Sequence, residues 1–140
     1  MSAVTITTDD VGQAKAPRNR GKANLLLWAL QGLLAALFAF AGVSKLTMPI
    51  DAVAKQFGMS GTFLRFIGVA EIIGAIGLVV PWALRIRREL TPIAAMGLLV
   101  IMIGATSIVY TSAGLPNALI PFTIGCLLAV VGYGRGRECR

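Results

Sequence analysis

Glu71 is the side chain in this sequence best placed to do chemistry, because it lies near the middle of an apolar segment, Phe63 to Val80. The other charged residue of this segment, Arg65, lies close to its start. A segment of this length can cross a bilayer as one helix, and a carboxylate at bilayer depth costs about 2.5 kcal/mol or more. Such a residue is kept where it has a partner, a protected interior or a function. The sequence therefore predicts a polar site around Glu71.

Lys45 is the cation best placed to meet Glu71. It ends a stripe of residues at helical spacing on the first apolar segment, namely Gln31, Ala35, Phe38, Gly42 and Lys45. A similar stripe on the next segment contains Gly68, Glu71, Gly74 and Ala75. Small residues let helices approach closely in lipid, so we expect the two stripes to face each other and to place Lys45 beside Glu71. The alternative partner, Arg65, is expected to reach the outer interface instead.

Three roles are open for a Lys45–Glu71 pair: fixing the register of two helices, holding a ligand or a proton, or contacting another subunit. Gln31 is a candidate ligand contact or a hydrogen bond between helices. Tyr110 is a candidate for the outer end of the polar core or an interfacial aromatic residue. The small residues of the stripes are expected to serve helix packing; they are Gly42, Gly68, Gly74 and Ala75.

The side chains on which most enzymes rely are scarce in this chain. It contains no histidine, the commonest metal ligand and proton shuttle. Its two cysteines, Cys126 and Cys139, would lie about 20 Å apart along one helix, which is too far for a disulfide. We therefore assign no catalytic residue and no metal ligand, and we expect no independent catalytic activity.

Four apolar segments must position these side chains. The composition, 56% hydrophobic and 14% charged, is typical of an integral membrane protein. The segments run from Leu25 to about Leu46, from Phe63 to Val80, from about Leu90 to Tyr110 and from about Ala118 to Tyr133. They predict an all-α bundle of four transmembrane helices, with a short uncharged turn over residues 111–117. Between the first two segments, residues 50–57 have the pattern of a short interfacial helix that Gly58 ends.

The distribution of charge predicts how the bundle lies in the membrane. Of the 13 lysines and arginines, ten fall in the two tails and in the loop between the second and third segments, which places both termini in the cytoplasm. This asymmetry explains the net charge of +7 without nucleic-acid binding. We predict a disordered basic tail over residues 1–23, a transmembrane domain over residues 24–134 and a basic tail over residues 135–140. The expected location is the plasma (inner) membrane of a bacterium.

Three motifs give the chain a family resemblance. They are Phe38-x-x-Ala41-Gly42-x-x-Lys45-Leu46, the run Arg65-Phe66-Ile67-Gly68-Val69-Ala70-Glu71-Ile72-Ile73-Gly74-Ala75, and Pro92-x-Ala94-Ala95-x-Gly97-Leu98. Over roughly residues 25–135 the chain resembles the DoxX-like membrane proteins of the DoxX/DoxD group. The resemblance implies a compact four-helix bundle, and some members of the group are associated with quinone-linked sulfur oxidation or with redox-defence partners.

The resemblance has one departure. Members of the group often carry a histidine near the end of the third helix, where this chain has Ile108-Val109-Tyr110. A proton or metal role that depends on that histidine is therefore not carried over to this protein.

Two functions follow as hypotheses. The first is an accessory or binding subunit that docks a membrane redox partner and holds a quinone or lipid near Glu71. The alternative is a small-molecule, ion or proton-coupled carrier that uses Glu71 and works as a homo-oligomer, because four helices are few for alternating access. Both functions require contact with the lipid bilayer, and neither requires nucleic acid.

Overall fold

The structure, a computed structural model, describes residues 18–139 of the chain. Within this range the chain forms five helices and no β-strand. The helices are α2 (Arg18–Thr47), α3 (Ile50–Phe57), α4 (Gly61–Ala83), α5 (Leu90–Ala113) and α6 (Leu115–Glu138). Four of them, α2, α4, α5 and α6, are long and apolar enough to cross a membrane. The predicted all-α protein with four membrane spans is confirmed.

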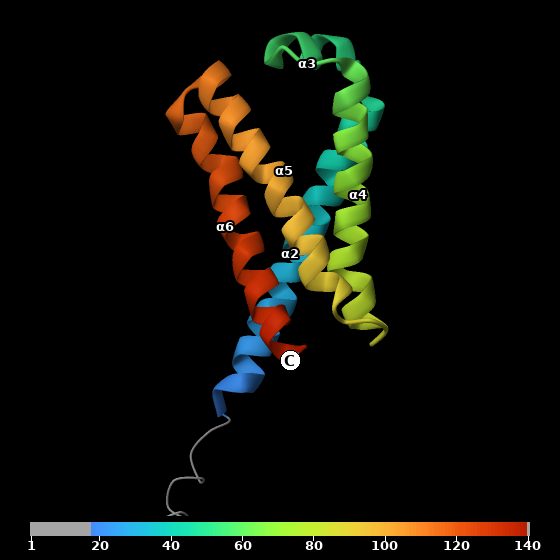
Figure 1. Ribbon diagram of the computed structural model, residues 1–140, viewed down its shortest axis with the longest axis vertical. Helices are drawn as coiled ribbons and strands as arrows, with labels where there is room; N and C mark the ends of the chain where they lie inside the picture. Colours follow the sequence, from blue (N-terminus) through green and yellow to red (C-terminus); the bar gives the residue numbers. More distant parts are fainter. Residues whose placement is uncertain (1–17, 140) are drawn as a thin grey trace, which may run out of the picture.

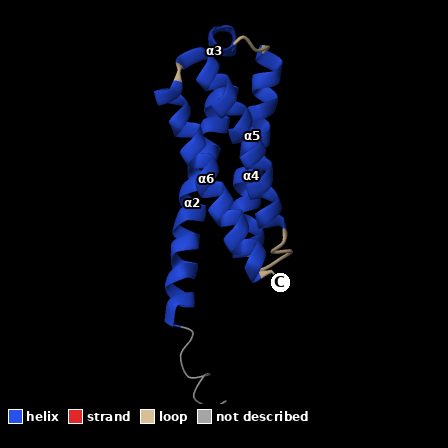
Figure 2. Ribbon diagram, turned by 60° about the vertical axis from the view of Figure 1, so that its left-hand side comes forward, coloured by secondary structure: helices blue, strands red, loops and turns tan. Residues whose placement is uncertain are grey.

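The four long helices form two packed pairs that are joined along α4 and α5. Helix α2 packs on α4. Helices α5 and α6 form a tight hairpin, and α5 also contacts α4. The short helix α3 lies across one end of the bundle (Figures 1 and 2). Following the predicted orientation, we call the end that carries α3 the outer end and the opposite end, with the loop from α4 to α5, the inner end. In Figure 1, α5 runs obliquely: it lies close to α4 at the inner end of the bundle and is separated from α4 at the outer end.

Helix α3 has the bounds that its sequence pattern predicts. It begins at Ile50 after Pro49, carries Asp51 in its first turn, and ends at Gly58, whose φ of 64° is the left-handed conformation that glycine adopts without strain. Its buried residues are Ile50 and Ala54. Because the amphipathic pattern sets which face is buried, α3 lies flat on the outer end of the bundle.

Several helix ends differ from the predicted ones. The turn predicted over residues 111–117 is reduced to Gly114, because its φ of 81° reverses the chain in one step and Pro116 fits the first turn of α6. Helix α4 continues through Pro81 to Ala83, and the backbone N–H of Leu84 donates to the Val80 oxygen at 2.9 Å across this last turn.

Helices α2 and α6 also extend into residues that were predicted to belong to the two tails. Residues 1–17 lie outside the described range, and α2 already begins at Arg18, so residues 18–23 are helical rather than part of a tail. At the other end, α6 continues to Glu138, so residues 135–138 belong to the bundle rather than to a basic tail. The reason is that Arg135 is buried in the structure and holds this last turn of α6 in place.

Side chains from the four long helices fill the centre of the bundle. The largest fully buried apolar side chains are those of Leu34, Phe38, Leu78, Leu98, Leu128 and Val131. Most other large apolar side chains point outward, where lipid surrounds them. Since lipid is as apolar as leucine, close packing and polar contacts rather than hydrophobicity must hold the helices together.

Close packing of α2 against α4 depends on Gly42. A Cβ atom at Gly42 would lie 2.6 Å from the backbone oxygen of Gly68, and one at Gly68 would lie 3.0 Å from Cβ of Lys45. The two predicted stripes therefore meet at this point. Gly74 also lies at a close helix contact, but it faces α5 rather than α2, and a Cβ atom there would lie 2.6 Å from Leu98. The 3.6-residue repeat turns Gly74 away from the α2 side of α4, whereas Ala75 is buried in the central core.

We expect the substitution Gly42→Ala to destabilise the bundle by about 1–3 kcal/mol, because the added methyl group collides with the backbone of a facing helix. Thermal unfolding of the purified protein in detergent measures this effect. Gly32→Ala is the matched control: it lies on the same helix with nothing within 4 Å of its Cβ position. The control should be neutral or stabilising by up to about 1 kcal/mol, and equal effects at both positions would contradict the packing role of Gly42.

Candidate functional site

Lys45 and Glu71 form an ion pair near the outer end of the bundle. The Lys45 Nζ donates to Glu71 Oε1 at 2.9 Å and to Oε2 at 2.7 Å. The Glu71 side chain is 3% exposed and that of Lys45 is 28% exposed. The close approach of α2 and α4 at Gly42 and Gly68 sets this geometry, because it brings the two side chains to one level of the bundle. The partner that the sequence predicted for Glu71 is therefore the one in contact with it.

The pair borders a cavity of about 460 Å³ at the outer end of the bundle. Residues of α4 and α5 form most of the walls, and Phe57 and Met59 close it on the side of α3. Lys45 and Glu71 are the charged residues of the lining, and its other members are apolar. A mostly apolar cavity with a few convergent polar groups is the usual form of a site for small molecules.

The pair offers both signs of charge to a ligand. Lys45 has three N–H donors, and two of them meet the Glu71 carboxylate, so one remains for a ligand in the cavity. The carboxylate keeps lone pairs that accept from a ligand hydroxyl. Because the two charges cancel, the site presents a dipole rather than a net charge.

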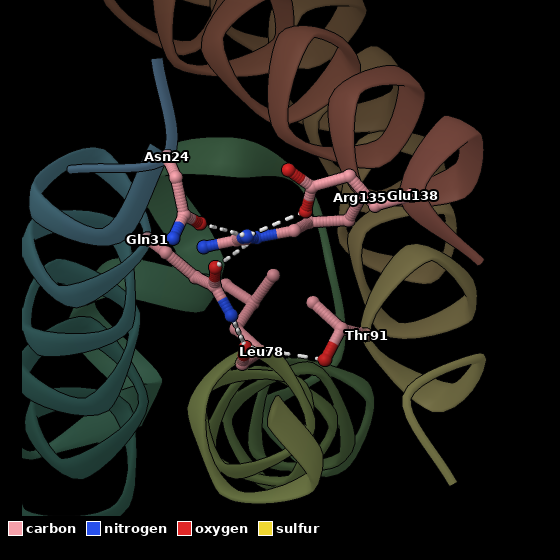
Figure 3. Close-up of polar contacts among 6 residues, drawn as sticks. All are labelled: Asn24, Gln31, Leu78, Thr91, Arg135 and Glu138. Carbon is pink, nitrogen blue, oxygen red and sulfur yellow. Dashed lines mark hydrogen bonds and ion pairs between the residues drawn. The ribbon is translucent and has the colours of Figure 1, made fainter. Parts of the chain in front are cut away.

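A second polar cluster lies at the inner end and is shown in Figure 3. Arg135 on α6 donates from Nε to Gln31 Oε1 at 2.9 Å, and from Nη1 to Asn24 Oδ1 and Glu138 Oε2, each at 2.7 Å. The amide of Gln31 in turn donates to the backbone oxygen of Leu78 on α4. We call these residues, together with Thr91, the Arg135 cluster; the Thr91 hydroxyl on α5 donates to the same Leu78 oxygen at 3.4 Å. The cluster thus ties all four long helices together.

Aromatic rings enclose the guanidinium group of Arg135. Its central carbon lies 4.1 Å from the ring centre of Trp82 and 5.7 Å from that of Trp28. The residue is 0% exposed, and its Nη2 has no hydrogen-bond partner in the described structure. The electron-rich faces of the two tryptophans stabilise the charge that these few hydrogen bonds leave buried.

Sequence reasoning missed Arg135 because a cation beyond an apolar segment is normally an interfacial anchor. The sequence offers only a spacing as a signal. Leu128, Val131, Gly132 and Arg135 recur at the spacing of one helix face, and the structure shows that this face of α6 is the buried one.

The remaining predicted site residues do not join Glu71. Gln31 belongs to the Arg135 cluster, about 21 Å along α2 from Lys45, and forms the interhelical hydrogen bond that was one of its two predicted roles. Tyr110 is 57% exposed and lines a different hollow of about 470 Å³ with Thr106 and Ser107. It is turned away because its neighbours Ile108 and Val109 occupy the cavity face of α5.

Fold and site together define a four-span helical membrane protein with a partly buried ion pair beside an apolar cavity. The chain matches the model of the DoxX-like family over residues 29–132, and it belongs to that family. No curated protein and no solved structure matches the chain. Glu71, Lys45 and the cavity-lining residues lie within the matched range, and Arg135 lies three residues beyond it.

Proposed function

We propose that this protein is a membrane binding protein that holds a neutral amphiphile, a quinone or a single-chain lipid, in the outer cavity beside Lys45 and Glu71. The observation that carries the proposal is the combination of an apolar cavity of about 460 Å³ with one ion pair in its lining. An apolar wall accommodates a ring or chain, and the pair supplies one donor and one acceptor for the polar head.

The charges of the pair favour a neutral head group. A carboxylate or phosphate head would be attracted by Lys45 and repelled by Glu71, which lie within 2.9 Å of each other. A cationic head would be attracted by Glu71 and repelled by Lys45. A head with a hydroxyl or carbonyl group satisfies both members of the pair and brings no further charge to bilayer depth.

The volume of the cavity limits the size of the bound part. A volume of about 460 Å³ equals that of about fifteen water molecules, at roughly 30 Å³ each. This is enough for a substituted ring or a short chain, but it is too small for the head and both chains of a phospholipid. A quinone head or the head of a single-chain lipid is the appropriate class.

Holding a ligand is better supported than carrying it across the membrane. A carrier needs a route from the outer cavity to the inner end. In the described structure that route is filled by buried core residues and then by the Arg135 cluster. If the alternative of a carrier that uses Glu71 is correct, Glu71→Gln should abolish flux into proteoliposomes and leave the fold intact.

We further propose that a subunit holding such a ligand serves a membrane redox partner, as the resemblance to the DoxX/DoxD group implies. Purification in mild detergent should then recover a partner in a fixed ratio. A homogeneous homo-oligomer without bound quinone or lipid would count against both the partner and the ligand.

We expect the purified protein to retain a neutral amphiphile that mass spectrometry of the extract identifies. The double variant Lys45→Met with Glu71→Leu removes the polar head site and leaves apolar side chains of similar length. It should reduce the retained ligand about tenfold, the effect of losing about 1.4 kcal/mol of hydrogen bonding.

Arg65→Met is the matched control, because Arg65 is exposed and lies outside the cavity lining. It should retain the ligand at the level of the original protein. The proposal fails if the original protein neither retains such a ligand nor binds an added isoprenoid quinone or isoprenoid alcohol.

A further inference from the structure

A groove runs along the lipid-facing side of the bundle between α4 and α5. It has a volume of about 590 Å³ and an almost entirely apolar lining. Its rim carries the large exposed side chains of Phe66, Ile73 and Ile93, which are 68%, 64% and 63% exposed. Its floor is formed by small residues, Gly74, Gly77, Ala94 and Gly97.

The groove adjoins the outer cavity. Phe66 and Ala70 on α4 and Ile101 on α5 line both spaces, so the two meet at these three residues. From Ala70 the groove extends along α4 to Pro81, a distance of about 16 Å at 1.5 Å per residue. This length is about half the thickness of the hydrocarbon core of a bilayer.

Building on the function proposed above, we propose that this groove holds the tail of the ligand whose head lies beside Lys45 and Glu71. The ligand class is then a neutral head with one long, flexible apolar chain, such as an isoprenoid quinone or an isoprenoid alcohol. The shared lining carries the proposal: the cavity and the groove border each other at Phe66, Ala70 and Ile101, so a ligand with its head in the cavity has to cross only this border for its tail to lie in the groove. A chain lying there runs from the outer third of the membrane toward the inner end, parallel to the helices.

Gly97 is the position at which this proposal can be tested without disturbing the fold. A Cβ atom there has nothing within 4 Å, so a larger side chain fills the groove and not the protein interior. The other glycines of the groove are packed: Gly74 lies against Leu98 and Gly77 against Ala94, with Cβ distances of 2.6 and 2.8 Å. Because Gly97 has open space and the glycines of α4 are packed, Gly97 is the position of the groove where the tail of the ligand can lie against the backbone.

The test compares short-tailed and long-tailed members of two neutral series. The probes are isoprenoid quinones and isoprenoid alcohols with short or long chains, measured at equal mole fractions in nanodiscs by the shift in thermal unfolding. Gly97→Leu should weaken the binding of the long-tailed members about tenfold, as expected for the loss of on the order of ten carbon contacts. The binding of the short-tailed members should not change.

Two further variants separate the head from the tail. Gly104 lines the outer cavity and also has open space at its Cβ, so Gly104→Leu should weaken short-tailed and long-tailed members alike. Gly32→Leu, on α2 and also with nothing within 4 Å, should affect neither.

The outcomes distinguish the two proposals. If no probe binds the original protein, the proposed function fails, and the groove proposal fails with it. If the probes bind but Gly97→Leu leaves the preference for long tails unchanged, the function stands and the groove is a surface for ordinary bilayer lipid. A change of oligomeric state in Gly97→Leu, without a change in tail preference, would overturn the groove proposal in favour of contact with a second copy.

Discussion

The substitution Lys45→Met should lower the free energy of unfolding by about 3 kcal/mol, the lower end of the range for breaking a buried ion pair. Glu71 is 3% exposed, so removing its partner leaves a carboxylate at bilayer depth with nothing to stabilise its charge. The lower end of the range applies because Lys45 itself is 28% exposed and part of the pair is solvated. Unfolding in mixed detergent micelles, followed by the fluorescence of Trp28 and Trp82, measures the change.

The double variant Lys45→Met with Glu71→Leu separates structural and ligand roles of the pair. Replacing both charges by apolar groups of similar shape is often neutral or stabilising, so most of the lost stability should return. Ligand retention should not return, because the head site is gone. Lys55→Met, an exposed lysine on α3, is the control and should change stability by less than about 0.5 kcal/mol. A double variant as unstable as the single one would contradict the assignment of the pair.

Arg135→Met should destabilise the protein by about 3 kcal/mol, through the loss of a hydrogen bond to buried Gln31 and of two cation–π contacts. Gln31 is 0% exposed, so its carbonyl oxygen cannot replace Arg135 with bulk water. Glu138 is 37% exposed and finds water, so it adds little to the loss. Equilibrium unfolding in the same micelles measures the effect.

Two companion variants test whether geometry or charge matters at this position. Arg135→Lys keeps the charge but lacks the planar group that stacks on tryptophan and donates to Gln31 and Asn24 together, so most of the destabilisation should persist. Arg137→Met removes an exposed arginine two residues away and should change stability by less than about 0.5 kcal/mol. Equal effects of Arg135→Met and Arg137→Met would show that the Arg135 cluster contributes nothing to the fold.

The two ends of the bundle differ in how polar contacts join the helices. At the inner end the Arg135 cluster joins all four long helices, and α5 lies close to α4. At the outer end α5 diverges from α4, and the cavity fills the space below α3. The Arg135 cluster therefore fixes the register of the helices at the inner end, and the outer end contains the cavity in which we propose that the ligand binds.

The spans and the ion pair could be predicted from the sequence because both depend on local patterns. Runs of about twenty apolar residues identify helices in a membrane without reference to their neighbours. A single carboxylate inside such a run calls for a partner, and Lys45 lies on the stripe of small residues that favours close approach. The same reasoning predicted α3, because its apolar spacing and Gly58 are adjacent in the chain.

Tertiary structure alone decided the burial of Arg135, the orientation of Gly74 toward α5, and the position of the outer cavity beside the α4–α5 groove. Each of these depends on the rotation and crossing of helices that are far apart in the chain; Arg135 and Gln31 are separated by 104 positions. In lipid, hydrophobicity does not determine which apolar face of a helix turns inward, because both faces meet apolar surroundings. Local sequence therefore determines which segments cross the membrane, and packing between the helices determines where a cavity forms.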